Sequence, residues 1–390
     1  MFRQGGLTFL VLAAIGGVSA APPVRATPPD LAIVRTPDEG LQPQVAVDRA
    51  GQVHVVYFKG PAAQGDLFYT RVNPATGRFS RVIRVNTHAG SAIATGTVRG
   101  AHIAIGSQGR VHVAWMGSSQ ATPRATRGAT PMLYARMNDA GTAFEPERNL
   151  LQFATGLDGG GSLAADATGR VYVAWHAGGS SSQGEGDRRV WLSRSEDDGR
   201  TFAREIATSP AEQGACGCCG MRAAVDRSGA LFMLFRSARA MVNRDTYMLT
   251  SRDHGMSFTA DKLHGWSVGA CQMSTYALAT TGERTFAAWE TAGQVHWLSV
   301  DSATGRRSAI VAPDGPAGGR KHPSIAATDQ GQVLLVWTEG TGWNKGGRLA
   351  WQRFDAAGRP DGVRGDAAGV ATWSLGAAAA LPDGRFAIVY

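Results

Sequence analysis

The sequence is poor in charged residues, in cysteine and in long apolar segments. Charged side chains make up 18% of the 390 residues, and there are only four cysteines. The formal net charge is +8, but Lys and Arg are scattered rather than clustered, so we expect no nucleic-acid partner. Beyond the N-terminal segment no stretch is long and apolar enough to cross a bilayer, so we expect no transmembrane segment after signal cleavage. Segments with the 3.6-residue period of amphipathic helices are scarce, which disfavours a helical fold.

Glycine, in contrast, is abundant, with 51 residues against a usual share of about 7%. Many Gly together with Val, Ala and Trp are typical of numerous short strands joined by tight turns. No Pro/Ser-rich linker or long charge run interrupts the chain, so we expect one domain over residues 21–390.

The N-terminus has the layout of a secretory signal peptide over residues 1–20. Arg3 supplies a positive charge, and an apolar run extends from Leu7 to Val18 before a group of small residues. We place the cleavage after Ala20, with Ala26 as the alternative. A membrane anchor is disfavoured because a spanning helix needs about 20 apolar residues. We therefore expect a secreted or periplasmic protein.

One pattern recurs along the chain: an apolar strand, a polar turn with Gly, and a second strand that ends in an aromatic residue. Alternation of this kind around a turn predicts a β-hairpin. The seven copies lie at 44–57, 102–115, 163–175, 222–235, 274–289, 324–337 and 375–390. A spacing of roughly 50 to 60 residues is typical of a blade array, so we predict an all-β propeller.

A second hairpin follows each of the first six copies and has a turn of the form Ser-x-Asp-x-Gly-x-Thr/Ser-Phe. The two most complete turns consist of Ser195, Asp197, Gly199 and Phe202, and of Ser251, Asp253, Gly255 and Phe258. Weaker copies lie at 73–79, 138–144, 301–305 and 355–358. In such a turn the Asp accepts hydrogen bonds from nearby amides and the Gly adopts a positive φ. We expect these residues to be structural, not catalytic.

These turns resemble the Asp-box, or BNR repeat, of the bacterial sialidase/neuraminidase superfamily, and the resemblance spans nearly all of 21–390. It implies a propeller of four-stranded blades, six of them in that family. Here the seven copies of the first hairpin, which we call the inner hairpins, are accompanied by only six second, or outer, hairpins. The chain stops after an inner hairpin. The stretch Leu31 to Thr36 would supply an outer strand to the last blade. We therefore predict seven blades closed by both termini, with six blades as the alternative.

Propeller topology also predicts where a site lies. If the strands of a blade are named A to D from the axis outward, the A–B and C–D turns share one face, the turn face. The longer B–C and D–A connections form the other, the loop face, and long loops on a rigid scaffold are where sites are built. The candidate ligand-binding residues there are Arg99, Arg222, Arg236, Arg320, His322 and His176. The candidate catalytic carboxylates are Glu290, Glu339 and Asp158.

The resemblance implies a catalytic set of three arginines, a Tyr activated by a Glu, and an Asp acid/base. In that family the first arginine belongs to a Phe/Tyr-Arg-Ile-Pro motif in blade one, where this chain has Leu41-Gln42-Pro43. The arginine is therefore missing, and no Tyr–Glu pair stands out on the loop face. We expect an atypical member that binds a carbohydrate or another anionic ligand on its loop face. The alternative is a sialidase-like glycoside hydrolase, which would need paired carboxylates.

All four cysteines fall at the starts of the fourth and fifth hairpin copies, as Cys216, Cys218, Cys219 and Cys271. Equivalent positions in neighbouring blades lie close together near the axis, so we expect Cys271 near the other three. In an exported protein this indicates disulfides. The alternative is a metal or redox centre, because soft thiolates with Met and His nearby would suit copper or zinc. A free reactive thiol is a third interpretation.

Overall fold

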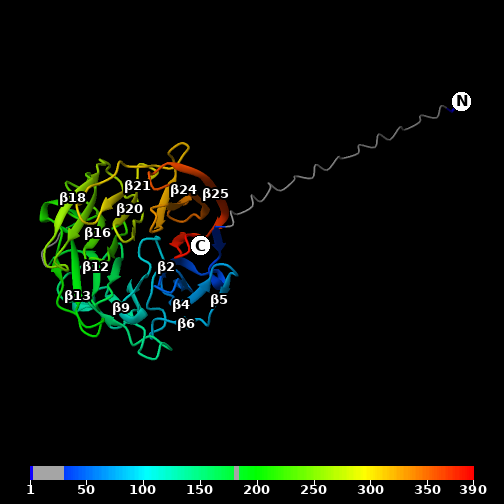
Figure 1. The fold of residues 1–390 in the computed structure, drawn as a ribbon. Helices are drawn as coiled ribbons and strands as arrows, with labels where there is room; N and C mark the ends of the chain where they lie inside the picture. Colours follow the sequence, from blue (N-terminus) through cyan, green and yellow to red (C-terminus); the bar gives the residue numbers. More distant parts are fainter. Residues whose placement is uncertain (3–29, 180–183) are drawn as a thin grey trace.

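Alternating apolar residues and Gly-containing turns fold the chain into antiparallel hairpins, and the hairpins assemble into seven sheets arranged in a ring (Figure 1). The computed structural model describes residues 1–2, 30–179 and 184–390. The prediction of an all-β propeller with seven blades is confirmed. The predicted signal peptide, apart from its first two residues, lies outside the described residues.

Blades 1 to 4 follow one another along the chain, each with its strands in the order A to D. Blade 1 contains β2 (Leu41–Val47), β3 (Val53–Lys59), β4 (Asp66–Asn73), β5 (Arg78–Phe79) and β6 (Ile83–Arg84). Blade 2 contains β7 (His102–Ile105), β8 (Val111–Met116), β9 (Met132–Arg136) and β10 (Arg148–Asn149). Blade 3 contains β11 (Gly161–Ala165), β12 (Val171–Ala177), β13 (Arg189–Ser195) and β14 (Ile206–Ala207). Blade 4 contains β15 (Arg222–Val225), β16 (Leu231–Arg236), β17 (Thr246–Ser251) and β18 (Thr259–His264).

The remaining blades complete the ring. Blade 5 contains β19 (Ala277–Thr280), β20 (Arg284–Thr291) and β21 (Gln294–Asp301), and isolated bridges to Val311 and Arg307 take the place of its fourth strand. Blade 6 contains β22 (Arg320–Ala327), β23 (Val333–Glu339), β24 (Gly347–Phe354) and β25 (Pro360–Val370). Blade 7 contains β26 (Ala377–Ala380), β27 (Phe386–Val389) and β1 (Leu31–Val34). Blade 5 thus has three strands rather than the four predicted, while blade 7 has its inner hairpin and one outer strand, as expected from the stretch Leu31 to Thr36.

Both ends of the described chain close the ring in blade 7, as predicted. Strand β1 pairs in parallel with β27, in a register that runs from Leu31 opposite Phe386 to Val34 opposite Val389. Blade 7 therefore requires residues from both termini.

Short 3-10 turns are the only helical elements among the described residues. They are η1 (Pro37–Glu39), η2 (Ser107–Gly109), η3 (Thr126–Gly128), η4 (Glu185–Asp187) and η5 (Ala211–Gln213). None of these turns has the length or the apolar character that a membrane-spanning helix requires.

The aromatic residue that ends each inner hairpin packs between adjacent blades. Trp115, Trp175 and Trp289 are 1%, 0% and 0% exposed, and each lies in a core cluster built from two neighbouring blades. Full burial of a large apolar side chain stabilises a fold by roughly 1.5–3 kcal/mol. The recurring aromatic in the sequence therefore marks the blade-to-blade core.

Small side chains on the A strands leave a channel along the axis. All seven A strands line it, and its volume is about 300 Å³. At the turn face it opens into a cavity of about 720 Å³ between the A–B turns of blades 1 to 4. At the loop face it narrows to about 30 Å³, beside Arg222 and His102, which is space for about one water molecule. The channel is therefore open toward the turn face and nearly closed toward the loop face.

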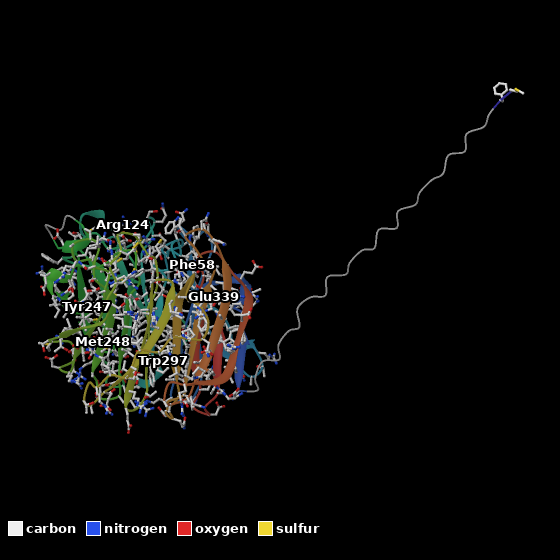
Figure 2. The ribbon with its side chains drawn as sticks, turned by 90° about the horizontal axis from the view of Figure 1, so that it is seen from above. Phe58, Arg124, Tyr247, Met248, Trp297 and Glu339 are labelled. Atoms are coloured by element: carbon white, nitrogen blue, oxygen red, sulfur yellow. A yellow bond between two sulfur atoms is a disulfide. The ribbon has the colours of Figure 1, made fainter. Side chains whose placement is uncertain are left out.

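The two faces are separated along the axis, which is seen from the side in Figure 2. Arg124, in the B–C connection of blade 2, lies at one end of the molecule, and Trp297, on the C strand of blade 5, lies toward the other. The loop face is therefore the upper surface in Figure 2 and the turn face the lower one.

The Asp-box turns are held by their own side chains. In blade 3 Asp197 accepts hydrogen bonds from the amide and hydroxyl of Thr201 at 2.8 and 2.7 Å, while the Gly199 amide donates to Ser195 at 2.9 Å. Gly199 has a φ of +76°, and a Cβ there would lie 1.8 Å from the Tyr134 hydroxyl of blade 2. The turn thus requires glycine for its backbone and for its close packing on the neighbouring blade.

The second Asp-box repeats this arrangement one blade further on. Asp253 accepts from the amide and hydroxyl of Ser257 at 2.9 and 2.5 Å, and the Gly255 amide donates to Ser251 at 2.7 Å. Phe258 packs in the core cluster between blades 3 and 4, and Phe202 contacts the Tyr134 ring edge-on at a centroid distance of 4.7 Å. Both boxes lie at C–D turns, away from the loop face.

Candidate functional site

On the loop face, charged side chains gather where the connections of blades 2, 3 and 4 meet. We call Arg99, Asp158, Glu185, Arg188 and Arg244 the loop-face cluster. Arg99 precedes blade 2 and Asp158 precedes blade 3, while the other three lie in B–C connections. The cluster therefore assembles from segments of three different blades.

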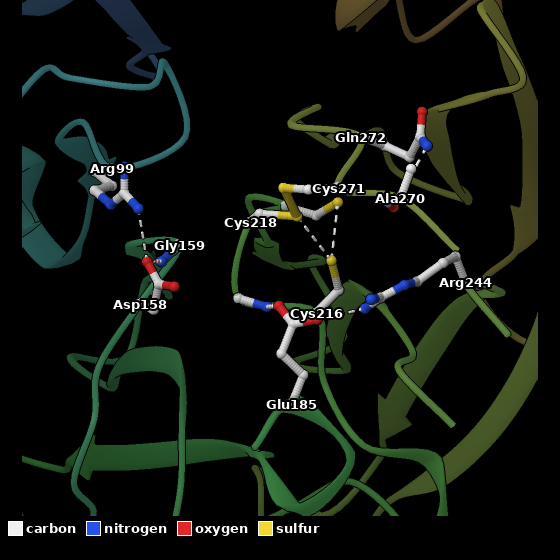
Figure 3. The surroundings of a disulfide bond; sticks show 12 residues. Arg99, Asp158, Gly159, Glu185, Cys216, Cys218, Arg244, Ala270, Cys271 and Gln272 are labelled. Atoms are coloured by element: carbon white, nitrogen blue, oxygen red, sulfur yellow. Dashed lines mark hydrogen bonds and ion pairs between the residues drawn. A yellow bond between two sulfur atoms is a disulfide. The ribbon is translucent and has the colours of Figure 1, made fainter. Parts of the chain in front are cut away.

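The backbone around Asp158 is shaped by two glycines. Gly159 and Gly160 have φ values of +74° and +73°, a region that glycine adopts without steric cost. A Cβ on Gly159 would lie 2.2 Å from the carbonyl oxygen of Gly217, in the cysteine loop. The close approach of these two loops places Asp158 beside the cysteines (Figure 3).

Ion pairs connect the cluster into a chain. Arg99 Nη2 contacts Asp158 Oδ1 at 2.8 Å. Arg188 Nη1 lies 3.6 Å from Asp158 Oδ2 and 3.5 Å from Glu185 Oε1. Arg244 Nη1 contacts Glu185 Oε2 at 2.8 Å. Three guanidinium groups thus surround two carboxylates, which leaves the cluster with a net positive charge.

The middle of the cluster is accessible to solvent. The side chains of Asp158, Arg99 and Arg188 are 30%, 18% and 20% exposed. An exposed indole lies beside it, because a Cβ on Gly96 would come within 3.0 Å of Arg99, Met273 and Trp343 together. Trp343 is 53% exposed, and the Trp373 indole donates to its carbonyl oxygen. A charged centre with an aromatic edge is a common way of binding a ring that carries an anionic group.

Two of the three predicted catalytic carboxylates lie outside the loop-face cluster. Glu290 is 1% exposed, and burial raises the pKa of its carboxyl group. Glu339 forms ion pairs with Arg320 at 3.3 Å and with Arg348. Burial opposes ionisation of Glu339, but hydrogen bonds from Trp337 and Arg348 outweigh it and lower the pKa. Only Asp158 of the three belongs to the loop-face cluster.

Four of the six predicted ligand-binding residues are buried. His176, Arg236, His322 and Arg320 are 0%, 1%, 5% and 7% exposed. Burial lowers the pKa of His176 to about 4 and that of His322 to about 3, so both rings are neutral at pH 7. Side chains at the ends of inner strands point between adjacent blades, which the order of residues along the chain does not reveal.

Arg236 and Arg320 are held by interior partners. The Arg236 guanidinium donates to the carbonyl oxygen of Arg244 at 2.9 Å and lies 4.9 Å from the ring centroid of Trp266. Arg320 donates to the carbonyl oxygen of Asp314 at 2.7 Å and lies over Trp337. Both arginines join the inner strand ends to the loops above them.

Arg222 narrows the loop-face end of the channel. Its Nη1 donates to Gln44 at 2.6 Å and to His102 Nδ1 at 2.7 Å, which joins blades 4, 1 and 2 across the axis. Burial lowers the pKa of Arg222 to about 10, and burial with the nearby guanidinium lowers that of His102 well below its usual value. Of the predicted ligand-binding residues, Arg99 alone reaches the accessible part of the loop face.

The cysteines lie together, as predicted. Cys218 forms a disulfide with Cys271 across blades 4 and 5, with a Cα–Cα distance of 6.1 Å (Figure 3). Cys216 and Cys219 are free thiols and are 1% and 0% exposed. The hydrogen bond from Cys216 and the charge of Arg236 lower the pKa of Cys219 to about 7, and the same hydrogen bond with burial raises that of Cys216.

The predicted copper or zinc centre can be tested against these donors. The sulfur atoms of Cys216, Cys218 and Cys219 all lie within 4.8 Å of one another. Because Cys218 is bonded to Cys271, two thiols remain, whereas a structural zinc site uses four ligands. In its disulfide-bonded state the cluster does not fit such a metal centre.

The sequence analysis did not identify Glu185, Arg188, Arg244 or Trp343. All four lie in B–C connections, outside the inner strand ends that supplied the candidates. The signal for Trp343 was a lone aromatic residue within the glycine-rich segment 340–347. For Glu185 and Arg188 the only signal was their place in a long connection.

Comparison with solved structures places this geometry in a known fold. The chain is similar to the NanB sialidase from Streptococcus pneumoniae, with 9% identity over 85% of this chain and 69% of that chain and a TM-score of 0.53. It is similar to a leech intramolecular trans-sialidase, with 11% identity over 91% and 86% of the two chains and a TM-score of 0.52. The chain has a sialidase-like fold.

This sialidase-like propeller also resembles proteins that are named for other activities. An α-L-arabinanase from Penicillium chrysogenum shares 11% identity over 83% of this chain and 95% of that chain, with a TM-score of 0.53. No family model and no curated protein matches the sequence. The predicted resemblance to the sialidase superfamily is therefore confirmed as a likeness of fold, shared with other carbohydrate-active propellers.

Proposed function

We propose that this protein is an exported propeller that binds an acidic carbohydrate on its loop face, at the loop-face cluster beside Trp343. The observation that carries the proposal is the partly exposed group of Arg99 and Arg188 around Asp158. Guanidinium groups bind carboxylates with charge-assisted, often paired hydrogen bonds. The anionic group of a sugar would compete with Asp158 for the two arginines.

The exposed indole of Trp343 favours a sugar over a simple anion as the ligand. Trp343 presents an exposed indole next to Arg99, so a pyranose ring can pack on the indole while its carboxylate contacts the guanidinium. The fold neighbours include proteins named as sialidases and an arabinanase, which supports a carbohydrate as the ligand class. Likeness of fold alone is a weak argument for activity, so the proposal rests on the side chains.

One observation favours glycoside hydrolysis as a second candidate function. Asp158 and Glu185 both contact Nη1 of Arg188, so two carboxylates converge on one guanidinium nitrogen. Hydrolysis of a glycosidic bond commonly uses such a pair. If this function holds, chromogenic glycosides of acidic sugars are cleaved and Asp158→Asn abolishes cleavage while the protein still binds the sugar.

The binding proposal is tested by calorimetric titration with 3′-sialyllactose and with oligogalacturonate, and with lactose as the neutral control. We expect binding of at least one acidic probe and none of lactose. Arg99→Gln should weaken binding by roughly tenfold or more, because a hydrogen bond to a charged group contributes about 1.5–3 kcal/mol.

The matched control is Arg200→Gln, which changes an arginine of the turn face whose side chain is 53% exposed. It should leave affinity unchanged. Equal loss of affinity in the two variants, or equal binding of lactose and 3′-sialyllactose, would overturn the proposal.

A further inference from the structure

The cysteine cluster holds two buried thiols in contact with a disulfide, an arrangement that glycan binding does not use. The Sγ atom of Cys216 lies 3.3 Å from that of Cys218 and 3.4 Å from that of Cys219. Cys216 thus stands between one end of the disulfide and the second free thiol. Cys271, at the other end of the disulfide, is exposed.

We propose that the four cysteines form a thiol–disulfide relay, in which the bond between Cys218 and Cys271 is exchanged, through Cys216, for a buried bond between Cys216 and Cys219. The exchange releases Cys218 and Cys271 as a pair of thiols on the loop face. Such exchange proceeds when a thiolate attacks one sulfur of a disulfide and the other sulfur leaves.

In the first step Cys216 attacks Cys218. In the reactive form Cys219 is a thiolate that accepts the S–H of Cys216, so this proton passes to Cys219 as the bond from Cys216 to Cys218 forms. The bond between Cys218 and Cys271 breaks, and Cys271 leaves with the electron pair as a thiolate. Its exposed position lets solvent stabilise that thiolate.

In the second step Cys219 loses its proton to the Cys271 thiolate, directly or through solvent, and attacks Cys216. The bond between Cys216 and Cys218 breaks, and Cys218 leaves with the electron pair and takes a proton from solvent. One disulfide and two reduced sulfur atoms are present before and after, and one proton is taken up from solvent, so no external oxidant or reductant takes part.

The spacing and surroundings of Cys216 and Cys219 fit the formation of a disulfide between them. Cys216 and Cys219 are separated by two residues, the C-x-x-C spacing of thiol–disulfide oxidoreductases. Arg236 lies near Cys219, whereas both Glu185 and Arg244 lie near Cys216, so positive charge faces the Cys219 sulfur and opposite charges face that of Cys216. The released Cys218 thiol would lie in the loop that approaches Asp158 and Gly159, and the released Cys271 thiol is exposed (Figure 3).

The inference is independent of glycan binding. Its consequence for the fold is the loss of the covalent link between blades 4 and 5, since Cys271 belongs to the connection that precedes β19. The exchange of the disulfide would therefore increase the mobility of the loop 265–276 at the edge of the loop face.

The experiment is thiol trapping of the folded, oxidised full chain with a maleimide and no reductant, followed by peptide mass spectrometry. In the wild type we expect labelling of Cys271 and Cys218, together with a peptide that carries the Cys216–Cys219 disulfide. In Cys216→Ser the attacking sulfur is gone, so labelling of Cys271 should slow at least tenfold. In Cys219→Ser the relay stops after one step, so Cys271 is labelled while Cys218 stays bonded to Cys216.

Two outcomes would overturn the relay. One is a wild-type protein in which Cys271 stays unlabelled for hours yet reacts fully once a reductant is added, a result that needs no variant. The other is labelling of Cys271 at the wild-type rate in both Cys216→Ser and Cys216→Ala. Circular dichroism verifies that each variant retains its β structure before labelling.

Discussion

The disulfide between blades 4 and 5 should contribute measurably to stability. Cys271→Ser removes it, and because Cys271 is exposed the substitution costs little packing. The bond joins residues 53 apart in the sequence. For a loop of about that length the chain-entropy relation gives about 14 cal/mol/K, or about 4 kcal/mol at 25 °C, and removal of native disulfides commonly costs about 2–5 kcal/mol.

The assay is denaturant unfolding followed by tryptophan fluorescence, with and without a reductant. We expect the unfolding midpoint of Cys271→Ser to lie below that of the wild type. Reductant should lower the wild-type midpoint toward that of the variant and change the variant's midpoint less, since a bond between Cys216 and Cys219 would close only a short loop. If Cys271→Ser and wild type unfold at the same midpoint under oxidising conditions, the disulfide does not stabilise the ring and the reasoning fails.

Two further predictions concern the turn face and the blade contacts. Asp197→Ala removes three hydrogen bonds, to the amide and hydroxyl of Thr201 and the hydroxyl of Ser195, and should lower stability by about 1–3 kcal/mol in thermal unfolding without changing glycan affinity. Loss of affinity with unchanged stability would contradict the assignment of the faces. Glu147 accepts four hydrogen bonds from Thr87 and His88; burial opposes its ionisation, but the bonds outweigh burial and lower its pKa. The pKa of Glu147 is lower in the folded protein than in the unfolded chain, where it is about 4.3. The stabilisation from its hydrogen bonds is therefore present above about pH 4.3 and is lost as the pH falls through the pKa of the folded state. Glu147→Gln should therefore be less stable than wild type at pH 7, with a difference that shrinks below about pH 4; a constant difference in melting temperature from pH 7 to pH 3 would refute this.

Most of the fold could be predicted because its signals are local. Each hairpin carries its own alternation, turn glycine and terminal aromatic, and Asp197 and Asp253 fix their turns through neighbours within four residues. Even the closure of the ring by Leu31 to Val34 followed from counting hairpins. The missing fourth strand of blade 5 could not be counted in this way, since the outermost strands are short and have little sequence pattern.

The candidate site was harder to predict because it depends on side-chain direction. Position along a strand identified Arg236 and His176 as residues near the axis, but not that they point between blades. Proximity of the cysteines followed from the equivalence of positions in adjacent blades, since geometry near the axis is repeated. The contact of Arg188 with both Asp158 and Glu185 depends on the way in which the long loops fold over one another. No periodic pattern in the sequence indicates that arrangement.

Hydrogen exchange can locate the glycan-binding site on one face of the propeller. The protein is labelled in deuterated buffer with and without saturating 3′-sialyllactose or oligogalacturonate, whichever binds. We expect slower exchange in the loop-face segments 95–99, 156–160 and 184–189, and no change in the A–B turns 48–51, 166–170 and 226–229. Protection of those turns, at the open end of the channel, with unchanged exchange around Asp158 would contradict it.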